Sequence, residues 1–177
     1  MRKVIFGGAN SLDNYLARPD GAVDWILFGD EAAELMKDMW ARFDTIVMGR
    51  KTYEHGKKYA PENSKNPFAG FRSVVFSRTI DPASEPDVEV VSADPGDFVR
   101  ELKSEEGKDI CVMGGGELGK TLLEAGVIDE IGFNVHPVLL GEGIPLFHNM
   151  NRQIDLELTE CRPFKNGCVY LNYRVKN

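Results

Sequence analysis

The sequence predicts an α/β fold, with a mixed, mostly parallel sheet flanked by helices and an antiparallel hairpin at its C-terminal end. Segments with strand character alternate with segments of helical periodicity as far as residue 125, and only strand-like alternation follows Gly126. At 177 residues and 42% hydrophobic content, the chain is long enough for one sizeable core and short for two. We therefore expect residues 1–177 to form a single domain.

The first elements are a strand, a helix and a second strand. Residues 3–9 are rich in strand formers and lead into a polar loop with a turn signal at residues 19–21. A helix is expected over residues 30–43, whose apolar side chains recur at helical spacing. We interpret this stripe as core rather than as a cofactor contact. Residues 45–48 are continuously apolar, as in a strand buried on both faces, and a helix follows them.

The middle of the chain continues the alternation. Residues 60–70 contain proline, asparagine and glycine and are expected to form an irregular surface loop. Strands are expected at residues 73–76 and 88–91, and a helix begins at Pro95. A strand over residues 110–113 then leads through three glycines into a fourth helix.

The C-terminal segments show the two-residue period of strands. Apolar and polar residues alternate over residues 131–136, 154–159 and 169–175. Asn166 and Gly167 indicate a two-residue hairpin loop, which would place Cys168 opposite Lys165 and Cys161 opposite Asn172. We therefore expect the cysteines to be free thiols.

The composition narrows the possible partners. The formal net charge of −7 and the pI near 5.0 argue against a general affinity for nucleic acid or anionic membranes. The sequence has no apolar run of about 18 residues and no signal-peptide pattern, so we expect a cytoplasmic protein. Three cysteines without metal-ligand spacing predict no metal site.

The most informative segment is the run of Gly114, Gly115 and Gly116 between a predicted strand and a predicted helix. Residues without Cβ let backbone N–H groups approach a ligand, and the helix adds the positive end of its dipole. The spacing matches neither of the two commonest nucleotide fingerprints. Taken alone, such a run is more typical of a tight turn than of a phosphate site.

Two other strand ends strengthen the phosphate interpretation. Gly49, Arg50, Lys51 and Thr52 follow one strand, and Ser77 and Arg78 follow the next. Ligands of open α/β sheets bind beyond the carboxyl ends of the strands. Cations and hydroxyls there suit the phosphate on the adenosine ribose of NADPH. The alternative is ordinary helix capping by Thr52 together with solvated arginines, which the coincidence of three strand ends disfavours.

Several segments in the same order make the chain resemble the dihydrofolate reductase fold, specifically the group related to the C-terminal reductase domain of bacterial riboflavin-biosynthesis enzymes. The resemblance rests on residues 11–17, 24–25, 48–54, 112–118, 129–130, 137–143 and 145–147. It implies NADPH-dependent hydride transfer to a small pterin-like or pyrimidine-like heterocycle, as in dihydrofolate reductase or 5-amino-6-(5-phosphoribosylamino)uracil reductase. It also implies a homodimer.

The resemblance assigns cofactor roles by position. The adenosine end would lie against Arg50, Lys51, Thr52, Ser77 and Arg78. The pyrophosphate would lie against Gly115, Gly116, Glu117 and Leu118, and the nicotinamide against Ala9 and Met113. The family habit further implies a cis peptide bond between Gly114 and Gly115.

Two departures leave the substrate open. Dihydrofolate reductases place a carboxylate on the first helix, where this chain has Ala33, with Glu34 and Asp30 nearby. Riboflavin-pathway reductases usually show a glutamate before the glycines, where this chain has Met113.

The remaining acid candidates are Asp13 and Asp24, in the loop after the first strand. We favour Asp13 as a proton donor with a raised pKa; a turn-forming role is the alternative for both. Trp25 is expected to be a pocket wall rather than a core aromatic, and Asp24, Trp25 and Glu34 are the candidate substrate contacts. His136 and His148 show no partner that would mark a ligand or base.

Two other functions fit parts of the sequence. The first is a catalytically inactive NADP(H)-binding module or sensor, which the missing helix carboxylate favours. The second is an unrelated α/β phosphate-binding domain, which requires Arg50 and Arg78 to lie far from the glycines.

Overall fold

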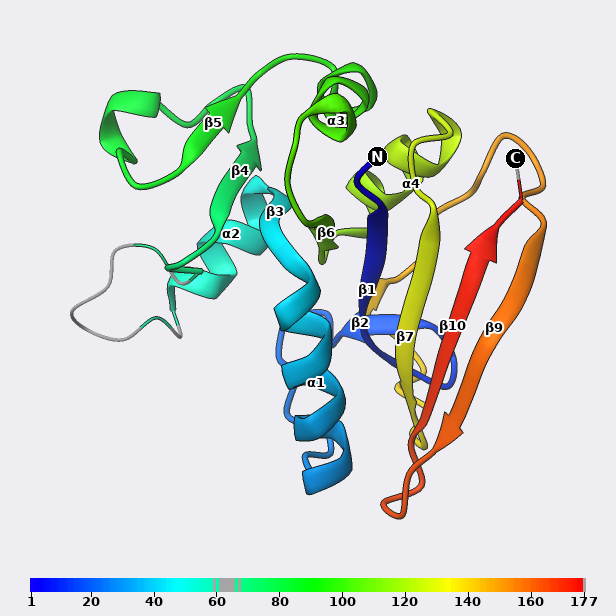
Figure 1. The fold of residues 1–177 in the computed structure, drawn as a ribbon. Coiled ribbons are helices and arrows are strands. Elements are labelled where there is room, and N and C mark those ends of the chain that lie inside the picture. Colours follow the sequence, from blue (N-terminus) through cyan, green and yellow to red (C-terminus); the bar gives the residue numbers. More distant parts are fainter. Residues whose placement is uncertain (59, 61–65, 67, 177) are drawn as a thin grey trace.

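An eight-stranded sheet forms the centre of the protein in the computed structural model, which describes residues 1–58, 60, 66 and 68–176 (Figure 1). The strand order is β5-β4-β3-β6-β1-β7-β10-β9, and a separate two-stranded sheet pairs β2 with β8. The strands are β1 (Val4–Ser11), β2 (Tyr15–Ala17), β3 (Phe43–Gly49), β4 (Arg72–Phe76), β5 (Glu89–Val91), β6 (Asp109–Met113), β7 (Glu130–His136), β8 (Ile144–Pro145), β9 (Leu156–Pro163) and β10 (Val169–Val175). The helices are α1 (Asp30–Arg42), α2 (Arg50–Lys57), the short 3₁₀ helix η1 (Pro82–Ser84), α3 (Pro95–Ser104) and α4 (Gly116–Glu124).

The predicted fold class is confirmed. The pairings from β5 through β1 to β7 are parallel, and β10 joins β7 and β9 antiparallel, as the change of period after Gly126 predicted. Most of the predicted loop over residues 60–70 lies outside the described residues. The small strands β2 and β8 were not predicted, because two or three residues carry too little periodicity to be recognised.

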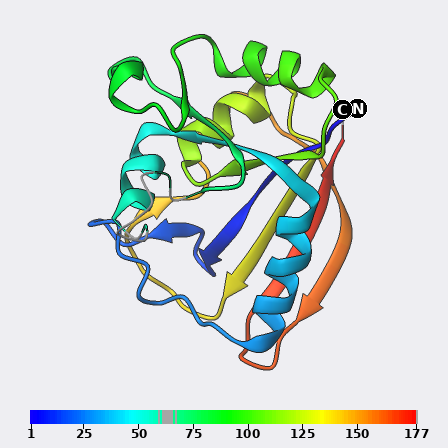
Figure 2. The ribbon, with the colours of Figure 1, turned by 60° about the vertical axis from the view of Figure 1, so that its left-hand side comes forward.

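Helices cover both faces of the sheet. Apolar residues of α3 and α4 pack with Val4, Phe6 and Val112 in one core cluster, and residues of α1 and α2 pack with Ile5 and Met48 in a second. Figure 2 shows α1 lying across the face of the sheet formed by the later strands. Parallel strands covered on both faces are the reason that residues 46–48 and 110–112 are continuously apolar.

The C-terminal hairpin differs from its prediction by one residue. Cys161 pairs with Leu171 rather than with Asn172, and Phe164 donates its N–H to the carbonyl oxygen of Cys168 at 2.8 Å. The loop therefore has three residues, with Gly167 in the left-handed conformation at its third position (φ 89°). All three cysteines are free.

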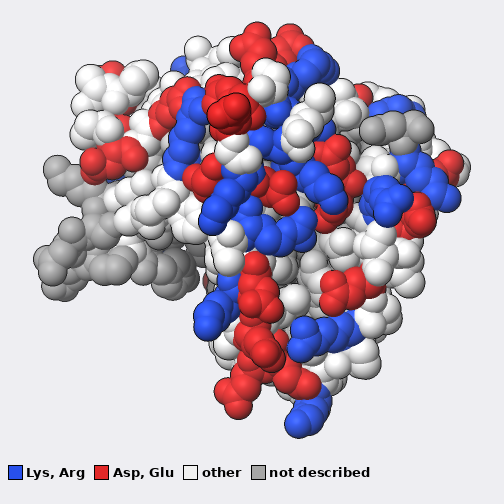
Figure 3. Space-filling model, in the orientation of Figure 1, with Lys and Arg blue, Asp and Glu red and all other residues white. Residues whose placement is uncertain are grey.

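Opposite charges are interspersed on the face seen in Figure 3. At the amino ends of the central strands, buried Glu130 binds Lys3 at 2.6 Å and Arg42 at 3.3 Å, and buried Arg2 binds Asp44. Because the pairs neutralise one another, this face offers no strong field of one sign. Within the described residues, no helix has the length and apolar character needed to cross a membrane.

Candidate active site

The three strand ends that the sequence singled out meet at one edge of the sheet. Strand β3 lies between β4 and β6, with Gly49 in register with Phe76 and Met48 in register with Met113. The segments that begin at residues 49, 77 and 114 are therefore neighbours. The unrelated phosphate-binding alternative required these segments to be scattered, and the register contradicts it.

The glycine turn after β6 makes no cis peptide bond in the described structure, so the expected cis bond between Gly114 and Gly115 is wrong. Both residues instead adopt left-handed conformations, with φ values of 63° and 50°, and these reverse the chain with trans bonds. A Cβ on Gly114 would lie 2.7 Å from Thr52 Oγ1. The turn after β6 and the first turn of α2 are thus in contact.

The start of α4 presents backbone N–H groups rather than a side-chain cap. Gly115 is the N-cap residue and makes no side-chain capping bond. A Cβ on Gly116 would lie 2.6 Å from the carbonyl oxygens of Pro145 and Leu146, so that residue must be glycine for packing alone. A Cβ on Gly49, by contrast, would meet nothing within 4 Å, which leaves space for a ligand against the backbone.

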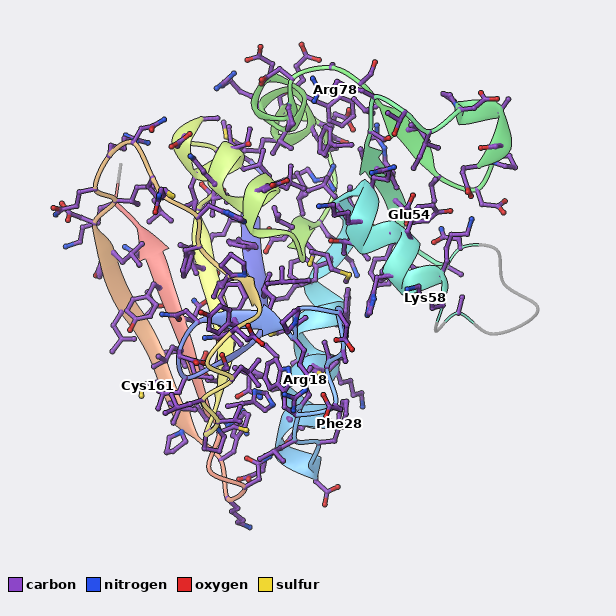
Figure 4. All side chains as sticks on the ribbon, turned by 180° about the vertical axis from the view of Figure 1, so that it is seen from behind. Arg18, Phe28, Glu54, Lys58, Arg78 and Cys161 are labelled. Carbon is purple, nitrogen blue, oxygen red and sulfur yellow. The ribbon has the colours of Figure 1, made fainter. Side chains whose placement is uncertain are left out.

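The predicted cations are exposed beside this turn. Arg50 lies 3.9 Å from Glu54, and neither Lys51 nor Arg78 forms a salt bridge with any described residue. Figure 4 shows Arg78 beyond the end of β4 on the same side of the molecule as Glu54 of α2. Exposed cations of this kind can form charge-assisted contacts with an anionic ligand.

The remaining predicted cofactor residues have mixed roles. Ser77 Oγ accepts N–H groups of Thr79 at 3.1 Å and of Ile80 at 3.0 Å, so it orders its own turn. Glu117 is exposed in the first turn of α4, whereas the side chain of Leu118 belongs to the core.

A cavity of about 240 Å³ lies between α1 and the sheet. Ala9 of β1 and Met113 of β6 both line it, and Met113 immediately precedes the glycine turn. The other lining residues are Ile5, Gly7, Gly8, Ile26, Leu27, Phe28, Ala32, Leu35, Met36, Met39, Trp40, Phe43, Cys111, Asn134, His136 and Tyr170. The apolar stripe of α1, interpreted as core, therefore also forms a cavity wall.

Polar side chains in the cavity wall are few. None of the described residues that line it is Asp, Glu, Lys or Arg. Burial raises the pKa of Tyr170 to about 12 and that of Cys111 to about 12, so both side chains stay neutral near pH 7. The hydrogen-bonding side chains of the wall include Asn134, His136, Tyr170 and the indole of Trp40.

The predicted substrate contacts lie outside this wall. The exposed Asp24 binds Arg18 at 2.6 Å, and this hydrogen bond lowers its pKa. Glu34 is exposed on α1, 3.9 Å from Arg162. Trp25 is buried and packs edge-to-face against His136, with ring centroids 5.3 Å apart. Of the three, Trp25 alone is joined to the cavity by a direct contact.

Asp13 ties two loops together. Its carboxylate accepts hydrogen bonds from Ser11 Oγ at 2.5 Å, from the N–H of Gly141 at 2.8 Å and from the N–H of Leu140 at 3.2 Å. The hydrogen bond from Ser11, followed by those from the two backbone groups, lowers the pKa of Asp13. The raised pKa expected of a proton donor is therefore wrong for this residue.

We predict that Asp13→Asn reduces the acid sensitivity of the fold. A lowered folded-state pKa gives stability that is complete above the ordinary carboxyl value of 3.8 and is lost as pH falls through the folded-state value. Urea unfolding at a series of acidic pH values measures the effect. The free energy of unfolding should fall less steeply with decreasing pH in the variant than in the wild type. Identical slopes would contradict the tie between the loops.

Sequence reasoning missed the polar side of the cavity. On β7, Gly132, Asn134 and His136 alternate with Ile131, Phe133 and Val135, and their face turns toward α1. A polar strand face opposite an apolar helix stripe was the signal that could have identified them. The position matched to the helix carboxylate, Ala33, is exposed, and its neighbour Ala32 lines the cavity instead.

The fold and site together define an α/β domain of the dihydrofolate reductase type, with a glycine turn beside an apolar cavity. The chain belongs to the RibD C-terminal domain family, whose model matches residues 2–170. It is 34% identical over 173 residues to the uncharacterized protein YwjB of Bacillus subtilis (strain 168), with 97% of each chain covered.

Solved structures show the same architecture. A putative riboflavin biosynthesis protein from Shewanella sp. PV-4 superimposes with a TM-score of 0.83 at 24% identity, covering 100% of both chains. Dihydrofolate reductase from Enterococcus faecalis, complexed with NADP(H), gives a TM-score of 0.68 at 18% identity, covering 99% of this chain and 97% of that one. These likenesses establish the fold.

Proposed function

We propose that this protein is an NADPH-dependent oxidoreductase that reduces a small pterin-like or pyrimidine-like heterocycle. The observation that carries the proposal is the continuity between the two parts of the site. Met113 lines the cavity, and the next residue begins the glycine turn at the start of α4. A dinucleotide lying along this edge would bring its redox end to the cavity that receives the substrate.

The residues present fit the cofactor. The free N–H groups at the start of α4 suit the pyrophosphate, and the open space at Gly49 allows close approach of a phosphorylated ligand. Arg50, Lys51 and Arg78 would neutralise the phosphate at the adenosine end, with the hydroxyls of Thr52 and Ser77 beside them.

The cofactor supplies a hydride when bound. The protein positions the cofactor and the substrate and excludes water from them. Ala9 and Met113 would form the wall where the two ligands meet, and the apolar side chains of α1 cover the opposite side. The solved dihydrofolate reductase noted above is complexed with NADP(H), and that likeness in fold supports the assignment.

The inactive dinucleotide-binding module is a second candidate, favoured by a specific observation. No carboxylate lines the cavity among the described residues, and Asp13 has a lowered pKa. Oxidation of NADPH, followed at its absorbance near 340 nm across pterins, pyrimidinones and quinonoid compounds, would separate the two candidates. Binding of NADPH without oxidation of any of them would favour the module.

A homodimer is part of the proposal. Strand β9 is an exposed edge of the sheet, with Leu156 and Leu158 at 39% and 53% exposure. Gel filtration at high protein concentration would test the homodimer, and elution as a monomer would contradict it.

We predict that Arg78→Ala weakens NADPH binding by about tenfold or more, because it removes a charge-assisted contact to phosphate. Binding of NADH, which lacks that phosphate, should change little. Fluorescence titration with both dinucleotides measures the difference. Arg174→Ala is the matched control: Arg174 is exposed on β10, well removed from β4 in the sheet order. An equal loss for both dinucleotides, or for the control, would contradict the assignment.

A further inference from the structure

The cavity contains a hydrogen-bond acceptor without a partner. His136, at the end of β7, is 1% exposed and lines the cavity. Its Nδ1 lies 3.0 Å from the backbone carbonyl oxygen of Asn134. A carbonyl only accepts, so Nδ1 carries the hydrogen, and in the neutral tautomer that this contact selects the lone pair is on Nε2. Nε2 is buried and has no hydrogen-bond partner in the described structure.

A second unpaired acceptor lies beside it. Asn134 Oδ1 is also buried without a partner in the described part of the chain, and Asn134 lines the cavity two residues before His136 on the same face of β7. A buried polar atom that lacks a partner is destabilising, because it has given up its hydrogen bonds to water without replacing them. These two acceptors, with the unpaired N–H donor of Trp25 packed against the His136 ring, give this side of the cavity polar groups that a hydrogen-bonding ligand would satisfy.

The rest of the wall restricts the charge of that ligand. Its described lining is apolar or neutral, and a phosphate or carboxylate placed inside would be buried without a counter-ion. The cations of the site, Arg50, Lys51 and Arg78, lie instead at the ends of β3 and β4. Aromatic and thioether side chains of α1, Trp40 and Met39 among them, offer flat apolar contact.

We propose that the cavity takes the uncharged ring of a planar heterocycle and that His136 Nε2 accepts a hydrogen bond from a ring N–H of that substrate. The inference rests on the proposed function and deepens it: the substrate class is a neutral lactam-type ring, with any phosphate or carboxylate left outside the cavity.

A matched pair of ligands tests the hydrogen bond. Lumazine is a planar pteridinedione with ring N–H groups, and dimethyllumazine carries methyl groups in their place. The 177-residue chain contains three histidines, so nitrogen-15 labelling of histidine gives a simple NMR spectrum in which His136→Phe assigns the His136 signals. Near neutral pH, lumazine should shift the Nε2 resonance of His136, and dimethyllumazine should leave it unchanged.

Affinity provides the second measurement. Trp25 contacts His136 and Trp40 lines the cavity, so tryptophan fluorescence reports binding. We expect lumazine to bind about tenfold more weakly to His136→Phe, and dimethyllumazine to bind both proteins alike. His136→Gln, which keeps an acceptor oxygen, should restore part of the difference.

The outcomes separate this inference from the proposed function. Equal binding of the two ligands by the wild type, or an unchanged Nε2 resonance with lumazine, overturns the role of His136 while leaving NADPH binding intact. A wild-type protein that does not bind NADPH would instead overturn the proposed function. The wild-type spectra decide the matter even where a His136 variant fails to fold.

Discussion

Gly116→Ala is expected to destabilise the protein by about 3 kcal/mol, a cost typical of forcing a side chain into a packed site. The added Cβ would lie 2.6 Å from the carbonyl oxygens of both Pro145 and Leu146, and 2.9 Å from the His148 ring. The two oxygens belong to the backbone and cannot rotate away. The sign is informative, because alanine otherwise favours a helix over glycine by about 1 kcal/mol.

Thermal unfolding measures this effect, with an expected fall in Tm of about 6–12 °C for a chain of this size. Gly49→Ala is the matched control, since a Cβ there meets nothing within 4 Å and the backbone φ is −83°. The control should keep the wild-type Tm and lose NADPH affinity, because the methyl group enters the space assigned to the phosphate. A stable Gly116→Ala protein would show that the packing of residues 145–148 on α4 is looser than described.

The fold was predictable because each long element carries its own period. The stripe of α1, Pro95 at the start of α3, and the apolar runs of β3 and β6 are local signals that the three-dimensional structure preserves. The hairpin register was not predictable to the residue. Asn166 and Gly167 fit both a two-residue and a three-residue loop, and the choice follows from the left-handed Gly167 closing onto Phe164.

The candidate site divides in the same way. The convergence of residues 49, 77 and 114 followed from strand ends alone, since parallel neighbours end at one edge. Predicting the cavity would require knowing how far α1 lies from the sheet, and no local sequence pattern contains that information. Asp13, favoured as an acid from its loop position, is held by N–H groups of residues 140 and 141, more than 120 residues away in sequence. The hydrogen bond from nearby Ser11 contributes most to the lowered pKa, and these long-range backbone contacts, which are invisible in the sequence near Asp13, lower it further.

Filling the cavity is expected to separate reduction from cofactor binding. Ala32 of α1 lines the cavity and packs in a cluster with Phe164, Cys168 and Tyr170. Ala32→Leu adds a branched side chain to that wall, so a heterocycle no longer reaches its position beside Ala9 and Met113. A misplacement of about 1 Å lowers such a reaction by about 100-fold, and we expect at least that loss in kcat/KM.

The chain supplies a closely matched control for this substitution. Ala33→Leu makes the same chemical change at the next position of α1, where the side chain is exposed, and should leave kcat/KM unchanged. NADPH affinity should stay at the wild-type value in both variants, because neither residue lies at the strand ends that hold the cations. Loss of reduction in Ala32→Leu alone, with NADPH still bound, would locate the substrate between α1 and the sheet. Equal kcat/KM in the two variants would instead place the reacting ring outside the cavity. That result would also contradict the role assigned to His136.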